Sequence, residues 1–145
     1  MKKLIFPFLI VGLLLNSCSK DKNLDYKKYK SYYEMSVIYM HRNYFIFFDD
    51  SLKENVVTTD SKYPLCSDLD SLFKLEPLEG VCIYRDSTVV FSTFSSGTDL
   101  KSIIISLVYT NDESKLNNIK TTVNEMIEKE DKGWYKFKRT ISIAD

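Results

Sequence analysis

The chain has 145 residues, and its twenty Lys and Arg residues balance its twenty Asp and Glu residues, so the formal net charge is zero at pH 7. A near-neutral chain has no broad positive field for nucleic acid, and we expect no nucleic-acid partner. Ten Tyr, nine Phe and only four Gly residues indicate a packed domain and exclude a disordered stalk.

The N-terminal segment combines a charged start with a short apolar run. Lys2 and Lys3 precede the uncharged residues 4–15, LIFPFLIVGLLL. At ~1.5 Å per residue, this run would cover about 18 Å of the ~30 Å hydrocarbon core of a bilayer. The pattern therefore predicts a secretory signal peptide instead of a membrane-spanning helix.

The sequence LNSC at residues 15–18 follows this run and resembles the lipobox of bacterial lipoproteins. The resemblance implies that residues 1–17 are a cleaved signal peptide and that the Cys18 thiol carries the lipid of a membrane anchor. The alternatives are an ordinary signal peptide, in which Cys18 is incidental, and a short N-terminal anchor. With lipidation, residues 18–23 form a tether, and residues 24–145 form one domain.

The tether gives an expectation about location. Its SKDK sequence at residues 19–22 is similar to the surface-export signals of Bacteroidota lipoproteins. A serine after the lipidated cysteine also resembles the signal for outer-membrane sorting. We therefore expect a cell-envelope protein, lipid-anchored in the outer membrane, and the leaflet stays open.

Two further cysteines, Cys66 and Cys82, follow in the domain. Because a bacterial envelope can be oxidising, an even pair of cysteines predicts a candidate disulfide. Closing a loop of about 16 residues would contribute roughly 3 kcal/mol to stability. The alternative is a pair of buried thiols that act as small apolar side chains.

The first half of the domain predicts helix and strand segments in turn. A helix over residues 24–42 is indicated by apolar residues at three- and four-residue steps: Tyr26, Tyr29, Tyr33, Val37 and Met40. We interpret this stripe as a helix face on a sheet, with a stacking platform for sugars as the alternative. The aromatic run 44–48 fits a buried strand, residues 50–66 fit a loop with one short strand at 55–59, and residues 67–73 fit a short helix.

The second half predicts most of the sheet. Residues 81–85 and 88–94 form a candidate hairpin, and 100–110 and 134–143 are further strands. Apolar residues at helical spacing predict a helix over 113–129. The expected fold class is therefore α+β, with a mainly antiparallel sheet of about four to five strands, an N-terminal helix and a second helix before the last strand.

The search for catalytic chemistry yields little. His41 is the only histidine, and no nucleophile signature accompanies it. The neighbouring carboxylates at 49–50, 68/70 and 112–113 fit no calcium loop and are typical of turns and helix caps. No glycine-rich phosphate loop is present. The sequence predicts no catalytic residue, no metal site and no cofactor.

Three Asp-Ser-Leu or Asp-Ser-Thr sequences, at residues 50–52, 70–72 and 86–88, resemble the O-glycosylation sequon of Bacteroidota envelope proteins. The resemblance implies modification at Ser51 and Ser87, which lie on predicted turns. The alternative is that Asp-Ser serves turns and helix caps, where the pair is favoured.

These observations favour a non-enzymatic binding module that is held at the membrane by its lipid and engages a protein partner. An immunity or inhibitor protein that intercepts a toxin would be one example. Tyrosine is enriched at protein interfaces because it combines contact area with a polar tip. The alternative function is a cell-surface accessory that binds or processes glycans, with Trp134 or tyrosines as stacking surfaces.

Overall fold

The computed structural model describes residues 23–44, 54–57, 65–96, 101–119 and 124–142. The helices are α2 (Tyr26–Arg42), α4 (Ser67–Leu75) and the short α5 (Leu116–Ile119), which continues from the 3-10 turn η1 (Glu113–Lys115). The strands are β1 (Glu54–Val57), β2 (Gly80–Tyr84), β3 (Val89–Ser96), β4 (Lys101–Tyr109), β5 (Asn124–Asp131) and β6 (Trp134–Ser142).

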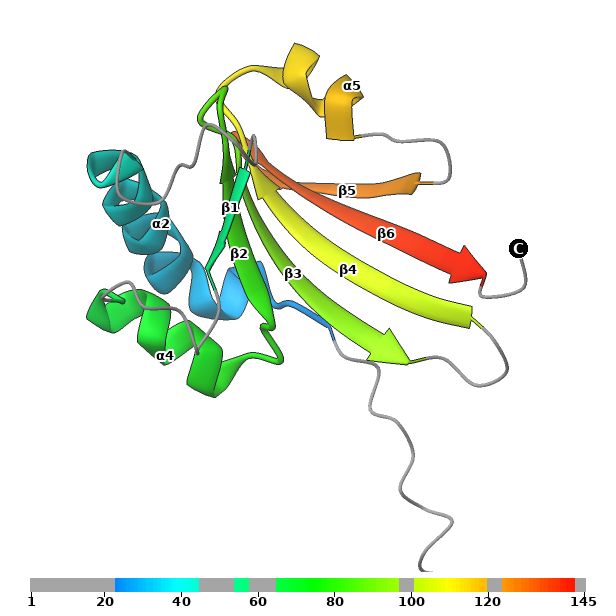
Figure 1. Ribbon diagram of the computed structural model, residues 1–145, viewed down its shortest axis with the longest axis horizontal. Helices are drawn as coiled ribbons and strands as arrows, with labels where there is room; N and C mark the ends of the chain where they lie inside the picture. The colour runs from blue at the N-terminus through cyan, green and yellow to red at the C-terminus, as the bar shows by residue number, and fades with distance from the viewer. Residues whose placement is uncertain (1–22, 45–53, 58–64, 97–100, 120–123, 143–145) are drawn as a thin grey trace, which may run out of the picture.

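The strands form one antiparallel sheet of six strands in the order β1-β2-β3-β4-β6-β5. Figure 1 shows α2 and α4 together on one side of this sheet, with α5 at its upper end. The expected α+β class and the mainly antiparallel sheet are confirmed. The sheet has one strand more than the upper limit expected from the sequence.

The extra strand replaces part of a predicted helix. Residues 113–129 were expected to be helical, but helix ends at Ile119 and β5 begins at Asn124. That expectation is wrong for residues 124–129, which belong to β5. The physical reason is tertiary pairing: β6 gains a hydrogen-bonded neighbour along its second edge, and this outweighs the local helical spacing of a few apolar residues.

Helix α2 follows the predicted pattern. Asp25 is its N-cap, and the carboxylate accepts a hydrogen bond from the backbone N–H of Lys28 at 3.1 Å. The predicted apolar face is buried against the sheet at Tyr26, Tyr33, Val37 and Met40. The interpretation of this stripe as a helix face on a sheet is therefore confirmed.

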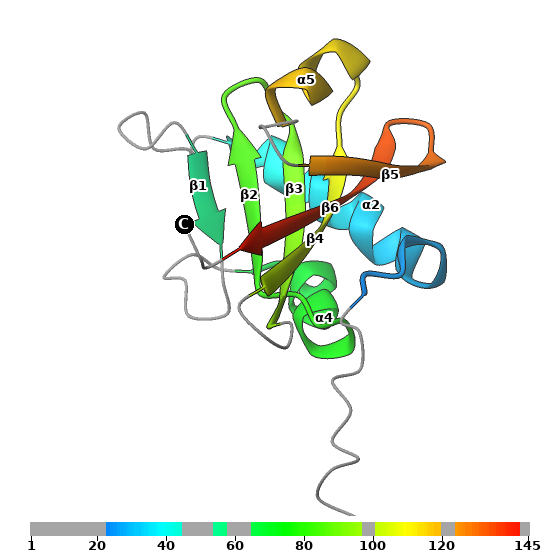
Figure 2. The ribbon, with the colours of Figure 1, turned by 90° about the vertical axis from the view of Figure 1, so that its right-hand side faces the viewer.

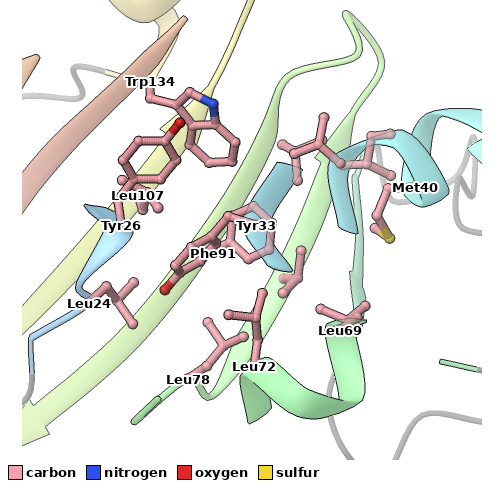
Figure 3. Packing of buried hydrophobic residues seen from close by; sticks show 14 residues of the cluster. Leu24, Tyr26, Tyr33, Met40, Leu69, Leu72, Leu78, Phe91, Leu107 and Trp134 are labelled. Carbon is pink, nitrogen blue, oxygen red and sulfur yellow. The ribbon is translucent and has the colours of Figure 1, made fainter. Parts of the chain in front are cut away.

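Apolar side chains gather on both faces of the sheet. The helix-side core lies between the sheet and the helices and consists of Leu24, Tyr26, Tyr33, Val37, Met40, Leu69, Leu72, Leu78, Val81, Ile83, Val89, Phe91, Leu107 and Trp134. Figure 3 shows its aromatic centre, in which Tyr33 meets the ring of Phe91 edge-on at a centroid distance of 5.0 Å.

The far-side core lies on the opposite face and consists of Val90, Val108, Leu116, Tyr135 and Phe137. Figure 2 shows that face toward the viewer, with α2 and α4 behind the sheet. Leu116 connects η1 and α5 to this second core. Strand β6 thus has apolar residues on both faces, with Trp134 in the helix-side core and Tyr135 and Phe137 in the far-side core.

Some expectations lie outside the described residues. These are the signal peptide, the tether with Cys18, residues 45–48 of the strand predicted at 44–48, and most of the loop around Ser51. The short strand expected at residues 55–59 corresponds to β1, which covers residues 54–57 and pairs with β2.

Candidate functional site

The structure places Ser87 and His41 together. Ser87 lies in the turn between β2 and β3, with an exposed side chain and a positive φ of 66°. The His41 Nε2 lies 2.7 Å from the Ser87 backbone oxygen. Ser87 is therefore on an accessible turn, as expected for a modification site, and His41 serves as a contact between α2 and this turn.

The structure does not bring Cys66 and Cys82 together. Cys66 precedes α4 and packs against the helix-side core, whereas Cys82 lies on β2 and packs against the far-side core. The sheet therefore separates the two sulfur atoms, and both residues are thiols without a disulfide. This arrangement favours the alternative of two separate thiols. Both are half-buried, and the Cys66 sulfur is the N-cap of α4, where it accepts a hydrogen bond from the backbone N–H of Leu69 at 3.5 Å.

The aromatic residues offered as a stacking surface are mostly internal. Trp134 is only 2% exposed and lies between the rings of Tyr26 and Tyr109, at centroid distances of 4.7 and 5.0 Å. Tyr26 and Tyr33 are likewise buried. These rings stabilise the core, and an outer surface for ligands has to come from other side chains.

Such a surface lies where β4 ends and β6 begins. A polar cavity of about 500 Å³ is formed by Tyr109, Thr110, Asn111, Glu113, Lys129, Lys132, Gly133 and Tyr135. A smaller side cavity of about 300 Å³ is formed by Glu34, Val37, Ile38, Tyr109, Lys132 and Trp134. Tyr109 and Lys132 belong to both cavities, so the two adjoin.

The turn between β5 and β6 shapes the polar cavity. Gly133 has a positive φ of 79°, and a Cβ atom there would lie 3.0 Å from the Thr110 backbone oxygen. The backbone N–H of Thr110 donates to the Gly133 oxygen at 2.9 Å, which fixes the end of β4 against this turn. Glycine is needed because other residues rarely adopt this conformation.

Three side chains converge on one wall of the polar cavity. The Glu113 Oε1 atom accepts hydrogen bonds from the Tyr135 hydroxyl at 2.6 Å and from the Lys129 ammonium at 2.8 Å. The Lys129 Nζ atom also lies 5.5 Å from the centre of the Tyr135 ring. Lys129 and Tyr135 come from paired positions of β5 and β6, so the sheet sets their spacing.

The electrostatics of this wall keep Glu113 ionised. The hydrogen bonds from Lys129 and then from Tyr135 lower the pKa of the Glu113 carboxyl below its ordinary value of 4.5. The pKa of Tyr135 is raised, first by burial and then by its hydrogen bond to Glu113. At neutral pH the wall therefore contains a carboxylate, an ammonium and a neutral phenol.

The opposite side of the polar cavity supplies donors. The Tyr109 hydroxyl donates to Asn111 Oδ1 at 2.7 Å, which orients the amide and leaves its Nδ2 hydrogens for another acceptor. Within the part of the chain that the structure describes, the Lys132 ammonium has no hydrogen bond or ion pair. Lys132 is exposed and lies between the two cavities.

Sequence reasoning missed this site. Glu113 was noted only as a capping charge, and Lys129 was placed on a helix that the structure replaces with β5. The residues come from the end of β4, from η1 and from the β5–β6 hairpin, so no local spacing links them. Correct pairing of β5 with β6 is the signal that would have placed Lys129 beside Tyr135.

A comparison with known protein families, with curated proteins and with solved structures finds no significant match to the chain. Among the described residues, no group of three or more His, Cys, Asp or Glu side chains is placed to hold a metal ion. None of the helices in the described ranges combines the length and the apolar character that crossing a membrane requires.

Proposed function

We propose that the chain is a lipid-anchored, non-enzymatic binding protein of a bacterial envelope and that the polar cavity is its binding site. The LNSC sequence at residues 15–18 supports the anchor, because it resembles the lipobox. Stable anchoring needs two or more acyl chains, and lipoprotein processing attaches that number to the cysteine.

The observation that carries the binding role is the preorganised wall of Glu113, Lys129 and Tyr135. Its hydrogen bonds of 2.6 and 2.8 Å join polar groups at the rim of a cavity of about 500 Å³, where the Glu113 and Lys129 side chains are 67% and 55% exposed. This volume lies within the ~300–1,000 Å³ range typical of small-molecule sites. Groups that are already ordered lose little conformational entropy on binding.

The same wall argues against glycan hydrolysis. A glycosidase needs one carboxylic acid that stays protonated near neutral pH beside a second carboxylate. In this cavity Lys129 and Tyr135 move the pKa of Glu113 in the opposite direction. Glu34, the carboxylate of the side cavity, is solvent-exposed and lies 3.8 Å from the Lys30 ammonium. The arrangement suits binding better than acid catalysis.

The test of this function has two parts. Mass spectrometry of the protein extracted from native envelopes should find a lipidated N-terminus at Cys18, and Cys18→Ser should move the protein out of the membrane fraction. Cys66→Ser is the matched control and should leave it there. A Cys18→Ser variant that stays with the membrane would contradict the anchor.

The second part identifies what the protein binds. Capture from solubilised envelopes, with analysis of both proteins and glycans, should yield one ligand. The Glu113→Ala variant should bind this ligand more weakly than the native protein does. The sequence-based hypothesis of a protein partner, such as a toxin, stays a prediction that this experiment decides. Recovery of no ligand of either class would contradict the binding role.

A further inference from the structure

The chemistry of the polar cavity restricts the class of ligand. Its walls are mainly polar side chains, whereas most sites for apolar small molecules are lined by apolar side chains with only a few polar groups. An apolar ligand would cover the Asn111 amide and the Lys132 ammonium without giving them a hydrogen-bond partner, which costs free energy. The ligand must therefore offer many hydrogen-bonding groups.

The charges of the cavity favour an anionic group on that ligand. Lys129 and Lys132 contribute two positive charges and Glu113 contributes one negative charge. Lys129 is already paired with Glu113 at 2.8 Å. The Lys132 ammonium has no hydrogen bond or ion pair with the described residues. A ligand carboxylate that reaches it would therefore form a charge-assisted hydrogen bond.

The other fixed groups suit hydroxyls and a ring. The ionised Glu113 accepts hydrogen bonds from hydroxyl groups, and the Asn111 amide donates to hydroxyl oxygens. Tyr109 is partly exposed and lines both cavities, so its ring can contact the apolar face of a sugar ring. Tyr135 is almost fully buried and contributes its hydroxyl to the wall through Glu113.

From these groups we propose that the polar cavity binds an acidic saccharide, a sugar chain that bears carboxylate groups. Its carboxylate lies on Lys132, its hydroxyls on Glu113 and Asn111, and a ring lies against Tyr109. The acidic unit stays in the polar cavity, because the adjoining side cavity is lined by the Glu34 carboxylate, which would repel a second negative charge. This inference rests on the proposed function, because it names the ligand of the same site.

The test uses the processed, lipid-anchored protein, extracted from membranes in detergent, on an array of acidic oligosaccharides. Each uronic-acid oligosaccharide is compared with its methyl ester, which has the same sugars without the negative charge. For the oligosaccharide that binds most tightly on the array, calorimetry then measures the dissociation constants of the acidic form and of the methyl ester. We expect the acidic form to bind at least about tenfold more tightly than the ester, and added salt to weaken its binding.

Two lysine variants locate the site. Lys132→Ala should weaken binding of the acidic form about tenfold, the loss of roughly one charge-assisted hydrogen bond. Lys74→Ala is the matched control: it removes the same charge from an exposed side chain on α4, outside both cavities, and should leave the affinity unchanged. Lys132→Gln provides a second variant of similar length.

The outcomes separate this inference from the proposed function. Equal binding of acid and ester, or full affinity in both Lys132 variants, would overturn the inference. If no saccharide binds but envelope capture yields another ligand, the inference fails and the binding role stands. If neither experiment yields a ligand, both fail.

Discussion

The Glu76 carboxylate accepts the backbone N–H of Asp25, with distances of 3.2 and 3.3 Å to its two oxygens. This contact joins the end of α4 to the start of α2 across 51 positions of the sequence. Glu76 is only 7% exposed, and burial raises the pKa of its carboxyl. One buried acidic group thus connects the two helices that cover the sheet.

Removal of this group should destabilise the domain. We expect Glu76→Ala to lower the free energy of unfolding by about 1–3 kcal/mol, because the Asp25 N–H loses its partner. Urea denaturation followed by circular dichroism measures the change. Glu128→Ala, at an exposed position of β5, is the control and should have little effect. An equal loss in both variants would contradict the role of the Glu76 contact.

The raised pKa of Glu76 predicts a pH dependence with a definite sign. A carboxyl whose pKa is higher in the folded state favours folding most below its unfolded pKa, about 4.5, and this contribution is lost as the pH rises through the folded pKa. Glu76→Gln removes the titration. The free energy of unfolding of Glu76→Gln, minus that of the native protein, should therefore increase between pH 4 and pH 7. A difference that is constant, or that falls with pH, would refute this assignment.

Removal of the Tyr33 hydroxyl should not lower stability, in contrast to removal of the Glu76 carboxylate. Its side chain is fully buried, and its hydroxyl has no hydrogen-bond partner among the described residues. Because a buried hydroxyl without a partner is costly, Tyr33→Phe should leave stability unchanged or raise it by up to about 1 kcal/mol. Tyr135→Phe is the comparison: it removes the 2.6 Å bond to Glu113 and should lower stability. Thermal denaturation of both variants decides, and a clear loss in Tyr33→Phe would indicate a hidden partner.

Gly133 tests the turn that shapes the polar cavity. We expect Gly133→Ala to destabilise the domain by about 1–3 kcal/mol, because alanine disfavours a positive φ. Gly133→Asn should lose less, since asparagine tolerates this conformation better. In chemical denaturation, the native protein should be the most stable, Gly133→Asn should be intermediate and Gly133→Ala should be the least stable. Equal stability of the three proteins would mean that the turn does not need its glycine.

The two thiols on opposite faces of the sheet predict a result in alkylation. When the protein is unfolded without reductant, Cys66 and Cys82 should both react with iodoacetamide, because the structure forms no bond between them. Mass spectrometry of the peptides counts the modified thiols. Labelling that requires prior reduction would show that the protein pairs them and that the described arrangement is wrong.

The parts of the fold that were predictable are those in which local pattern and tertiary partner agree. The stripe from Tyr26 to Met40 marks a helix face, and the β-branched runs on either side of Asp86 and Ser87 form the expected hairpin of β2 and β3. Residues 124–131 were not predictable in this way, because their apolar positions also fit a helix. Only pairing with β6 decides for a strand.

The candidate site was less predictable than the fold. Asn111 and Glu113 lie close in sequence, but Lys129 and Tyr135 join them only when β5 folds against β6. The spacing of side chains along one segment does not predict contacts with residues of a distant segment. The alternative function offered Trp134 as an outer stacking surface, but this side chain is only 2% exposed.

The position of the polar cavity also affects how the protein responds to its ligand. Lys129, Lys132 and Gly133 belong to the hairpin of β5 and β6, and β5 is the last strand at that edge of the sheet. Edge elements are often the first to open in native-state fluctuations. A ligand that binds only the closed hairpin therefore makes its opening rarer by mass action. Slower amide hydrogen exchange along this edge would accordingly report occupancy of the cavity.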